Sequence, residues 1–207
     1  SFLAGLYHIQ EEVSMLPVTL LEPKPGERIL DLCAAPGSKT IQMLLTMQNC
    51  GTVVANDRHS GRLRTVNRNL NRLGLVSGAV TACDGTNYPK EAGIFDRVLV
   101  DVPCSAQGIS RKTPRVMAHW GDVGSSLGLS GVQKALLRKA FQLCKPGGRI
   151  VYSTCTYAPE ENEAVVNAIL EEFGAQGLEL IPARIPGFHC SEGLTEWQGV
   201  RFSSDVQ

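Results

Sequence analysis

The sequence predicts an α/β protein with a mostly parallel, twisted sheet that carries helices on both of its faces. Apolar stretches that end in an acidic residue recur along the chain, and residues 94–101 form the clearest one, with a dense run of β-branched side chains. Segments with the spacing of helices separate these stretches. Such an alternation is typical of parallel sheets, which bind ligands at the carboxyl ends of their strands.

The composition indicates one globular domain that works inside a cell. The 207 residues suit a single domain, with 43% hydrophobic and 19% charged residues. The formal net charge is zero, so contact with nucleic acid requires a local basic patch. The seven cysteines include no C-x-x-C pair, which argues against a disulfide framework or a metal site. The sequence shows no signal peptide and no apolar run long enough to span a membrane.

A strand-to-helix turn follows the first predicted strand, residues 28–30. The turn has the sequence DLCAAPGSKT at residues 31–40. Pro36 and Gly37 break the strand, and Ser38 is predicted to be the N-cap of the next helix. Small residues in the turn let a ligand approach the backbone, although an ordinary turn of an α/β protein is the alternative. The spacing of a Walker phosphate loop is absent, which argues against a nucleoside triphosphate.

Residues 1–24 are predicted to form a helical segment beside this turn. Gln10 and Ser14 on the segment are either ligand contacts or part of a solvated helix face. The prediction of a helix rests on four apolar residues that recur at helical spacing, Ile9, Val13, Leu16 and Leu20.

Acidic residues end the next two predicted strands. Asp57 ends the strand at residues 51–57, where nucleoside-binding α/β folds hold ribose hydroxyls; its alternative role is to cap the helix at residues 60–73. That helix carries several arginines, which form either a solvated basic face or a contact with phosphates. Asp84 ends the strand at residues 79–84, where its carboxylate could accept a hydrogen bond from the exocyclic amine of adenine.

A long, Gly- and Ser-rich loop is predicted for residues 105–131. A helix at residues 132–143, a strand at residues 149–153 and a helix that opens at residue 159 follow it. The loop combines cations with one large aromatic side chain, a mixture that holds single-stranded nucleic acid. The residues concerned are Arg111, Lys112, Arg115 and Trp120.

Two cysteines follow neighbouring predicted strands, Cys104 after residues 94–101 and Cys155 after residues 149–153. A buried cysteine usually has a structural role, but both of these lie in turns at the edge of the sheet where ligands bind. A free thiol has a pKa of about 8.5, and a helix N-terminus just after Cys155 is expected to lower it.

Five stretches of the sequence together resemble the Sun-type RNA cytosine-C5 methyltransferases, a family that uses S-adenosylmethionine. The likeness covers nearly the whole chain and implies a Rossmann-like methyltransferase fold that depends on this cofactor. The matching stretches are DLCAAPGSKT at residues 31–40, DVPCS at 101–105, STCT at 153–156, GLYHIQEEVSMLP at 5–17 and PEENEA at 159–164.

The resemblance assigns a role to each candidate site residue. Cys155 would be the nucleophile, Cys104 would assist product release, and Asp101 would lie near the reacting methyl group and the target base. Asp57 would hold the ribose of the cofactor and Asp84 would lie at its adenine. The methionine part of the cofactor would be lined by Cys33, Ala34, Ala35, Pro36, Gly37, Ser38 and Lys39.

The resemblance further implies formation of 5-methylcytosine in rRNA or tRNA through a covalent cysteine–cytosine intermediate. DNA cytosine methyltransferases lack the second cysteine, so the presence of both favours RNA. The alternatives are a cytosine methyltransferase acting on DNA and a non-catalytic cofactor- or RNA-binding scaffold in ribosome assembly. The expected protein is a monomer without metal or membrane contact. Its compartment would be the cytoplasm of a bacterium or archaeon, or the nucleus or nucleolus of a eukaryote.

Two departures from the family accompany the likeness. Residues 1–24 would precede a catalytic domain at residues 25–207, in which nothing matches the family's final Gly-Phe-Phe strand. The sheet is therefore expected to lack its last hairpin. No added RNA-binding domain is expected within the chain.

Overall fold

The chain forms two compact units in the computed structural model, which describes residues 1–120 and 123–206. The backbone passes from one unit to the other after Asp101, after Arg138 and after Ser153. Unit 1 consists of Ser1–Asp101 and Lys139–Ser153, and unit 2 consists of Val102–Arg138 and Thr154–Gln207.

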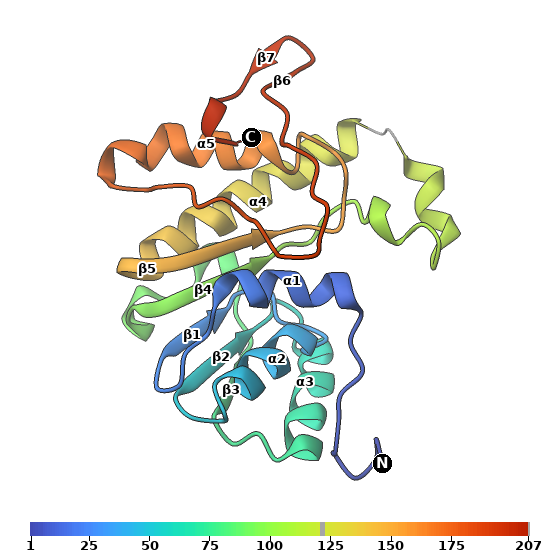
Figure 1. Ribbon diagram of the computed structural model, residues 1–207, viewed down its shortest axis with the longest axis vertical. Helices are drawn as coiled ribbons and strands as arrows, with labels where there is room; N and C mark the ends of the chain where they lie inside the picture. Colours follow the sequence, from blue (N-terminus) through green and yellow to red (C-terminus); the bar gives the residue numbers. More distant parts are fainter. Residues whose placement is uncertain (121–122, 207) are drawn as a thin grey trace. The chain divides into compact units, whose positions relative to one another are not determined.

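Unit 1 contains a five-stranded sheet in the order β3-β2-β1-β4-β5, in which every neighbouring pair is parallel (Figure 1). The strand order reverses between β1 and β4, so the carboxyl ends of these two strands form the switch point at which open α/β sheets bind ligands. The strands are β1 Arg28–Asp31, β2 Thr52–Asn56, β3 Gly78–Thr81, β4 Phe95–Asp101 and β5 Cys144–Ser153.

Three helices of unit 1 share one hydrophobic core with the sheet. Helix α1 (Glu12–Leu21) packs on β4 and β5, α2 (Ser38–Thr46) packs on β2, and α3 (Ser60–Leu73) packs on β3. Helix α2 also contacts α1 and α3, so the three helices form a continuous layer. The side chains that join this layer to the sheet are fully or almost fully buried and include Leu21, Ile29, Leu44, Val66 and Leu99.

Two arginines of the sheet hold the carboxyl end of α1. Arg97 is buried and donates from Nε to Glu27 Oε2 at 2.6 Å. It also donates to the carbonyl of Leu21. Arg149 donates to the carbonyl of Leu20 at 2.8 Å. The last carbonyls of a helix have no partner within it and carry partial negative charge, so these cations fix the position of α1 on the sheet.

Unit 2 is built around two helices, α4 (Val123–Leu143), whose last residues belong to unit 1, and α5 (Glu163–Phe173). The short 3₁₀ helices η3 (Gln107–Ile109) and η4 (Pro114–His119) precede α4. A small antiparallel hairpin follows α5 and consists of β6 (Glu196–Trp197) and β7 (Val200–Arg201). The indole of Trp197 donates to Glu160 at 2.8 Å, which ties this hairpin to the turn before α5.

The predicted fold class is confirmed, whereas several element boundaries were wrong. Helix α4 begins at Val123, inside the segment predicted to be a loop, because Ser126, Ser130 and Gln133 form a buried stripe at helical spacing. The N-cap of α2 is Gly37 rather than Ser38. Strand β5 begins at Cys144, five residues before the predicted start.

The N-terminal segment also differs from its prediction. Helix α1 begins only at Glu12, and it buries Val18 and Leu21. Ile9 and Val13 are 70% and 65% exposed, so they are not part of the buried face. No helix among the described residues combines the length and the apolar character needed to cross a membrane.

Candidate active site

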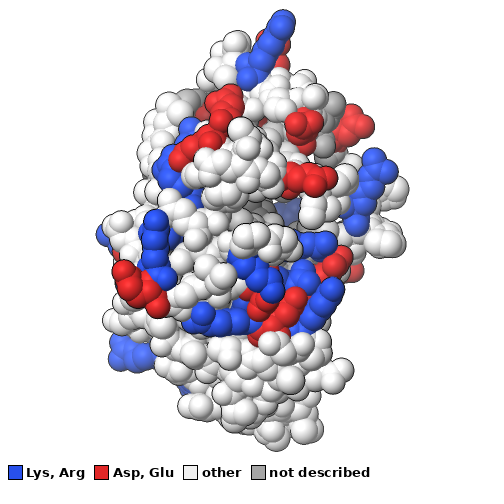
Figure 2. Space-filling view, turned by 90° about the vertical axis from the view of Figure 1, so that its left-hand side faces the viewer, with Lys and Arg blue, Asp and Glu red and all other residues white. Residues whose placement is uncertain are grey.

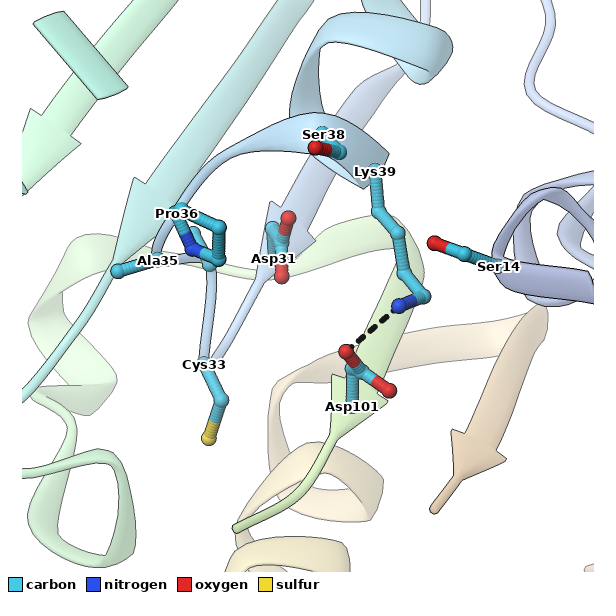
Figure 3. A pocket seen from close by; sticks show the side chains of 9 residues that line it. Ser14, Asp31, Cys33, Ala35, Pro36, Ser38, Lys39 and Asp101 are labelled. Carbon is cyan, nitrogen blue, oxygen red and sulfur yellow. Dashed lines mark hydrogen bonds and ion pairs between the residues drawn. The ribbon is translucent and has the colours of Figure 1, made fainter. Parts of the chain in front are cut away.

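A pocket of unit 1 lies at the carboxyl ends of β1 and β4, where the strand order reverses (Figure 3). The turn between β1 and α2 supplies most of its wall, α1 adds Ser14, and β4 adds Asp101. The lining residues are Ser14, Asp31, Cys33, Ala34, Ala35, Pro36, Ser38, Lys39 and Asp101.

The turn between β1 and α2 keeps its backbone close to the sheet. The amide of Leu32 donates to Leu99 at 2.9 Å, and the amide of Ala34 donates to Asn56 at 2.7 Å. Gly37 has a φ angle of +105°, and a Cβ atom placed there would meet the Val66 side chain at 3.2 Å. Only glycine suits this position, which explains why the turn ends in Pro-Gly.

Asp101 lies at the centre of a polar contact across the pocket. Its Oδ2 accepts from the ammonium of Lys39 at 2.7 Å, and its Oδ1 accepts from the hydroxyl of Ser153 at 2.7 Å. Figure 3 shows the Lys39 side chain reaching over the pocket to this carboxylate. This ion pair places the Lys39 ammonium, from the start of α2, beside the Asp101 carboxylate at the end of β4.

Asp31 is the most deeply buried acid of the pocket, with 1% of its surface exposed. Its Oδ2 accepts from the Thr40 hydroxyl at 2.6 Å, whereas its Oδ1 is buried and has no hydrogen-bond partner among the described residues. Burial raises the pKa of Asp31 to about 7, against the lowering effect of the Thr40 hydrogen bond. A buried acceptor that lines a pocket and lacks a donor fits a ligand that carries a donor group.

Asp57, Asp84 and Gly37 are predicted site residues that do not line this pocket. Asp57 is 4% exposed; its Oδ2 accepts from the Ala35 amide at 3.2 Å, and its Oδ1 accepts from the His59 amide at 2.9 Å. Through its bond to Ala35, Asp57 stabilises the turn between β1 and α2. Asp84 caps the short helix η1 (Gly85–Asn87), accepting from the amide and the hydroxyl of Thr86.

Unit 2 contains the two predicted catalytic cysteines in direct contact. The sulfur atoms of Cys104 and Cys155 are 3.1 Å apart, and the amide of Cys155 donates to Cys104 Sγ at 3.2 Å. The hydrogen bond from the Cys155 side chain is the largest cause that lowers the pKa of Cys104, to about 7, and the Cys155 and Ala106 amides add to it. This arrangement stabilises a thiolate at Cys104.

Two other cysteines have the opposite chemistry. Burial raises the pKa of Cys33, which lines the pocket of unit 1, far above its ordinary range. Burial also raises the pKa of Cys144 to about 11. Both thiols are therefore neutral at physiological pH, and of these three cysteines only Cys104 combines partial exposure with a lowered pKa.

The expected helix N-terminus just after Cys155 is wrong. Helix α5 begins at Glu163, eight residues after Cys155, because residues 159–162 form a turn rather than a first helical turn. The lowered pKa of Cys104 arises from hydrogen bonds that the Cys155 side chain and the Cys155 and Ala106 amides make to its sulfur.

The residues predicted to contact nucleic acid lie on exposed parts of unit 2. Arg111, Lys112 and Arg115 are exposed around η3 and η4. Trp120 is 47% exposed and lies 6.1 Å from the ring of Tyr157, measured between ring centroids. Tyr157 is two residues after Cys155, so an aromatic pair with an exposed face adjoins the cysteine turn.

Comparison with known proteins shows the family to which this chain belongs. The model of the family described as 16S rRNA methyltransferase RsmB/F matches residues 18–193. The chain belongs to this family. It is 42% identical over 203 residues to a tRNA (cytosine(49)-C(5))-methyltransferase of Pyrococcus abyssi, covering 98% of this chain and 64% of that protein. It is 41% identical over 210 residues to a human 28S rRNA (cytosine(4447)-C(5))-methyltransferase, covering 100% of this chain and 25% of that protein.

Solved structures agree with the family assignment. A methyltransferase homologue from Pyrococcus horikoshii matches 99% of this chain and 62% of its own, with a TM-score of 0.81 and 36% identity. A SAM-dependent O-methyltransferase from Thermotoga maritima shares the fold alone, with a TM-score of 0.53 and 18% identity. The sheet of this chain thus has the Rossmann-like fold of S-adenosylmethionine-dependent methyltransferases.

Two lining residues of this RsmB/F chain, Asp31 and Ser14, lie outside the predicted cofactor motif at residues 33–39. Asp31 precedes the predicted cofactor residues directly, and its position at the end of β1 was the signal that could have identified it. Ser14 on α1 also lines the pocket. A ligand contact was one of the two roles predicted for this residue. Within the described part of the chain, no cluster of acidic, histidine and cysteine side chains could hold a metal ion.

Proposed function

We propose that this chain is the catalytic part of an S-adenosylmethionine-dependent RNA methyltransferase that forms 5-methylcytosine in rRNA or tRNA. The observation that carries the proposal is the pair of thiols 3.1 Å apart, one of which has a pKa of about 7. Cys104 also follows Asp101, a residue of the pocket, by only three positions in the chain. Family membership supports the reaction. The two relatives that match 98% and 100% of this chain are named cytosine-C5 methyltransferases of tRNA and of 28S rRNA.

The pocket of unit 1 fits the amino-acid part of the cofactor. An ammonium group would supply the donor that Asp31 Oδ1 lacks, and the small side chains of Ala34 and Ala35 leave the backbone accessible. When bound, S-adenosylmethionine supplies an electrophilic methyl group carried on a sulfonium ion. Asp57 and Asp84 retain acceptor capacity for ribose and adenine, because each carboxylate oxygen accepts more than one hydrogen bond.

The two cysteines divide the covalent chemistry between them. The Cys155 thiol gives its proton to the thiolate of Cys104 and its sulfur attacks carbon 6 of cytosine, which makes carbon 5 enamine-like and able to take the methyl group. A base then removes the proton from carbon 5. The electrons of that bond restore the ring double bond, and the bond between sulfur and carbon 6 breaks to return a thiolate at Cys155. Cys104 assists this release.

Asp101 acts in this proposal as a hydrogen-bond acceptor for the target base. Its carboxylate is held by donors from Lys39 and Ser153, and an ionised carboxylate accepts but does not donate. The exocyclic amino group of cytosine is a donor of the kind that it accepts. Lys39 and Ser153 thereby fix the orientation of the group that selects cytosine.

The test replaces the two cysteines one at a time, because the proposal gives them different roles. Cys104→Ala and Cys155→Ala are each mixed with tRNA, rRNA and tritiated cofactor. Cys155→Ala should give neither methylation nor a covalent adduct. Cys104→Ala should attack more slowly, because water must then take the proton of Cys155, and it should methylate but fail to release. A protein–RNA adduct should therefore survive denaturing electrophoresis and disappear on proteolysis. Cys50→Ala, which changes an exposed thiol of unit 1, is the control and should behave as wild type.

Other outcomes decide between the alternatives. An adduct trapped in Cys155→Ala and lost in Cys104→Ala would reverse the two roles. Methyl transfer to DNA but not to RNA would make this a DNA enzyme, and cofactor binding without turnover on either nucleic acid would make it a scaffold. We also propose that the chain acts as a monomer in the compartment that holds its RNA, which light scattering and cell fractionation would test.

A further inference from the structure

The residues on both sides of Cys104 are held by one pair of buried polar side chains. The carbonyl of Pro103 accepts from Gln133 Nε2 at 2.9 Å, and the amide of Ser105 donates to Glu161 Oε2 at 3.0 Å. Gln133 Nε2 also donates to Glu161 Oε2 at 2.8 Å, which joins the two side chains. Gln133 comes from α4 and Glu161 from the turn before α5, so two separate elements meet at the Cys104 turn.

The burial of this pair is complete, with 0% of either residue exposed. A buried carboxylate is costly unless hydrogen bonds compensate for its lost hydration. Here two neutral donors, the Ser105 amide and the Gln133 amide, converge on one oxygen of Glu161. Apolar side chains would fill the same space without this cost, but they would leave the backbone of the Cys104 turn without its partners.

The same turn before α5 also holds the cysteine on the other side of the pair. Asn162 follows Glu161; its Oδ1 accepts from the Thr154 hydroxyl at 2.7 Å, and its Nδ2 donates to the Thr156 carbonyl at 3.2 Å. The residues before and after Cys155 are therefore tied to Asn162. The hydroxyls of Ser105 and Thr156 are 2.7 Å apart and connect the two cysteine turns.

We propose that Glu161 and Gln133 are positioning residues, which clamp the Cys104 turn so that its sulfur stays within hydrogen-bonding distance of Cys155. The proposal rests on the proposed function, in which a proton passes between these two sulfurs. Gln133 binds the Pro103 carbonyl and Glu161 binds the Ser105 amide, so both act on Cys104 through the backbone on either side of it.

The charge of Glu161 has a second, separable effect. Among the groups that face Cys104, Cys155 and the Ala106 amide lower its pKa, whereas the negative charge of Glu161 raises it. Glutamine at position 161 keeps an oxygen that accepts from Ser105 and Gln133 but carries no charge. Alanine removes both the charge and the acceptor. The two substitutions therefore separate geometry from electrostatics.

The test uses Glu161→Gln, Glu161→Ala and Gln133→Ala in the full chain, with Glu160→Gln as the matched control. Glu160 is the neighbouring acid, and its contact is with the Trp197 indole instead. The first readout is the rate at which iodoacetamide alkylates Cys104 as a function of pH, followed by peptide mass spectrometry. The second is methyl transfer, measured as kcat together with the affinity for S-adenosylmethionine.

Glu161→Gln should keep kcat near the wild-type value and move the alkylation midpoint of Cys104 to lower pH. Glu161→Ala and Gln133→Ala should lower kcat by about tenfold or more without changing the affinity for the cofactor, because a displacement of about 1 Å has effects of this size. Glu160→Gln should change neither readout. Thermal unfolding verifies that each variant is folded.

The proposal is overturned if folded Glu161→Ala retains the wild-type kcat, or if Glu161→Gln, which keeps the acceptor, lowers kcat as much as alanine does. The alkylation readout needs neither cofactor nor RNA. If wild type itself transferred no methyl group, the proposed function would fail, and the alkylation profile of Glu161→Gln would still decide whether Glu161 acts on Cys104. The isosteric variant also remains informative if the alanine variants do not fold.

Discussion

Asp31 is the residue whose ionisation most directly opposes the stability of unit 1. Burial raises its pKa from 3.8 to about 7, so the native chain holds a proton there that the unfolded chain releases. The contribution of Asp31 is therefore fully present below about pH 4 and is lost as the pH rises towards 7.

Asp31→Asn should remove this loss. The melting temperature of the variant relative to wild type should rise between about pH 4 and about pH 7 and stay level above it. Asp84→Asn is a control of opposite sign, because hydrogen bonds from Thr86 lower the pKa of Asp84, and its contribution is lost as the pH falls. Parallel melting curves for Asp31→Asn and wild type would contradict the assignment. The measurement is made without cofactor, by calorimetry.

At the scale of the element, the position of α1 depends on Arg97. This side chain is 9% exposed and its partner Glu27 is 19% exposed, so the ion pair is largely buried. Arg97→Met keeps most of the packing but leaves Glu27 without its cationic partner and the carbonyl of Leu21 without the guanidinium donor. Breaking one side of a buried pair costs about 3–5 kcal/mol, and we expect a loss of unfolding free energy of about that size.

Arg149→Met is the comparison variant for α1. Arg149 pairs with Glu22, whose side chain is 58% exposed, and exposed pairs contribute about 0–1 kcal/mol. The free energies of unfolding are measured by urea denaturation. Equal losses in the two variants would show that burial of the Arg97 pair has no special effect on the anchoring of α1.

The strands could be predicted from the sequence because their signals are local. β-branched and apolar runs identify β2 and β4, and an acidic residue marks the end of β4. The start of α4 could not be predicted this way, because Gly124, Gly128 and several serines have low helix propensity. Burial of Ser126 and Ser130 overrides this propensity, and that burial is visible only in the folded chain.

The candidate site, too, has a part that a local motif predicts and a part that depends on contacts between distant residues. Cys33 to Lys39 are contiguous, so one motif predicts that they line the pocket, and of these seven residues only Gly37 does not line it. The contacts of Gln133 with Pro103 and Glu161 span 30 and 28 positions, and no local pattern encodes them. Glu161 was part of a recognised motif, yet its burial and its partners were not predictable from that motif.

At the scale of the whole molecule, the question is which surface meets RNA. The face shown in Figure 2 mixes acidic and basic side chains without an extended field of one sign, as the zero net charge suggests. Recognition therefore depends on local groups of cations. Two such groups are Arg111, Lys112 and Arg115 in unit 2, and three of the exposed arginines of the α3 region in unit 1, namely Arg58, Arg64 and Arg68.

Neutralising Arg111, Lys112 and Arg115 to glutamine should weaken RNA binding and flatten its dependence on salt. Each lost contact with a single strand lowers the slope of log K against log salt by about 0.7, so we expect a change of up to about 2. The matched variant changes Arg58, Arg64 and Arg68 to glutamine. Fluorescence anisotropy across a salt series decides the matter: a flatter slope in the matched variant alone would place the RNA on α3.

The contact between Cys104 and Cys155 also makes unit 2 sensitive to oxidants. A thiolate with a pKa of about 7 reacts with hydroperoxides to give a sulfenic acid and water or an alcohol, and a thiol 3.1 Å away then displaces a second water to close a disulfide. Both sulfurs that the proposed reaction needs would then be locked in one bond. Thiol reductants would restore them, so the proximity on which the proposed methyl transfer depends also makes the two thiols dependent on the redox state of their surroundings.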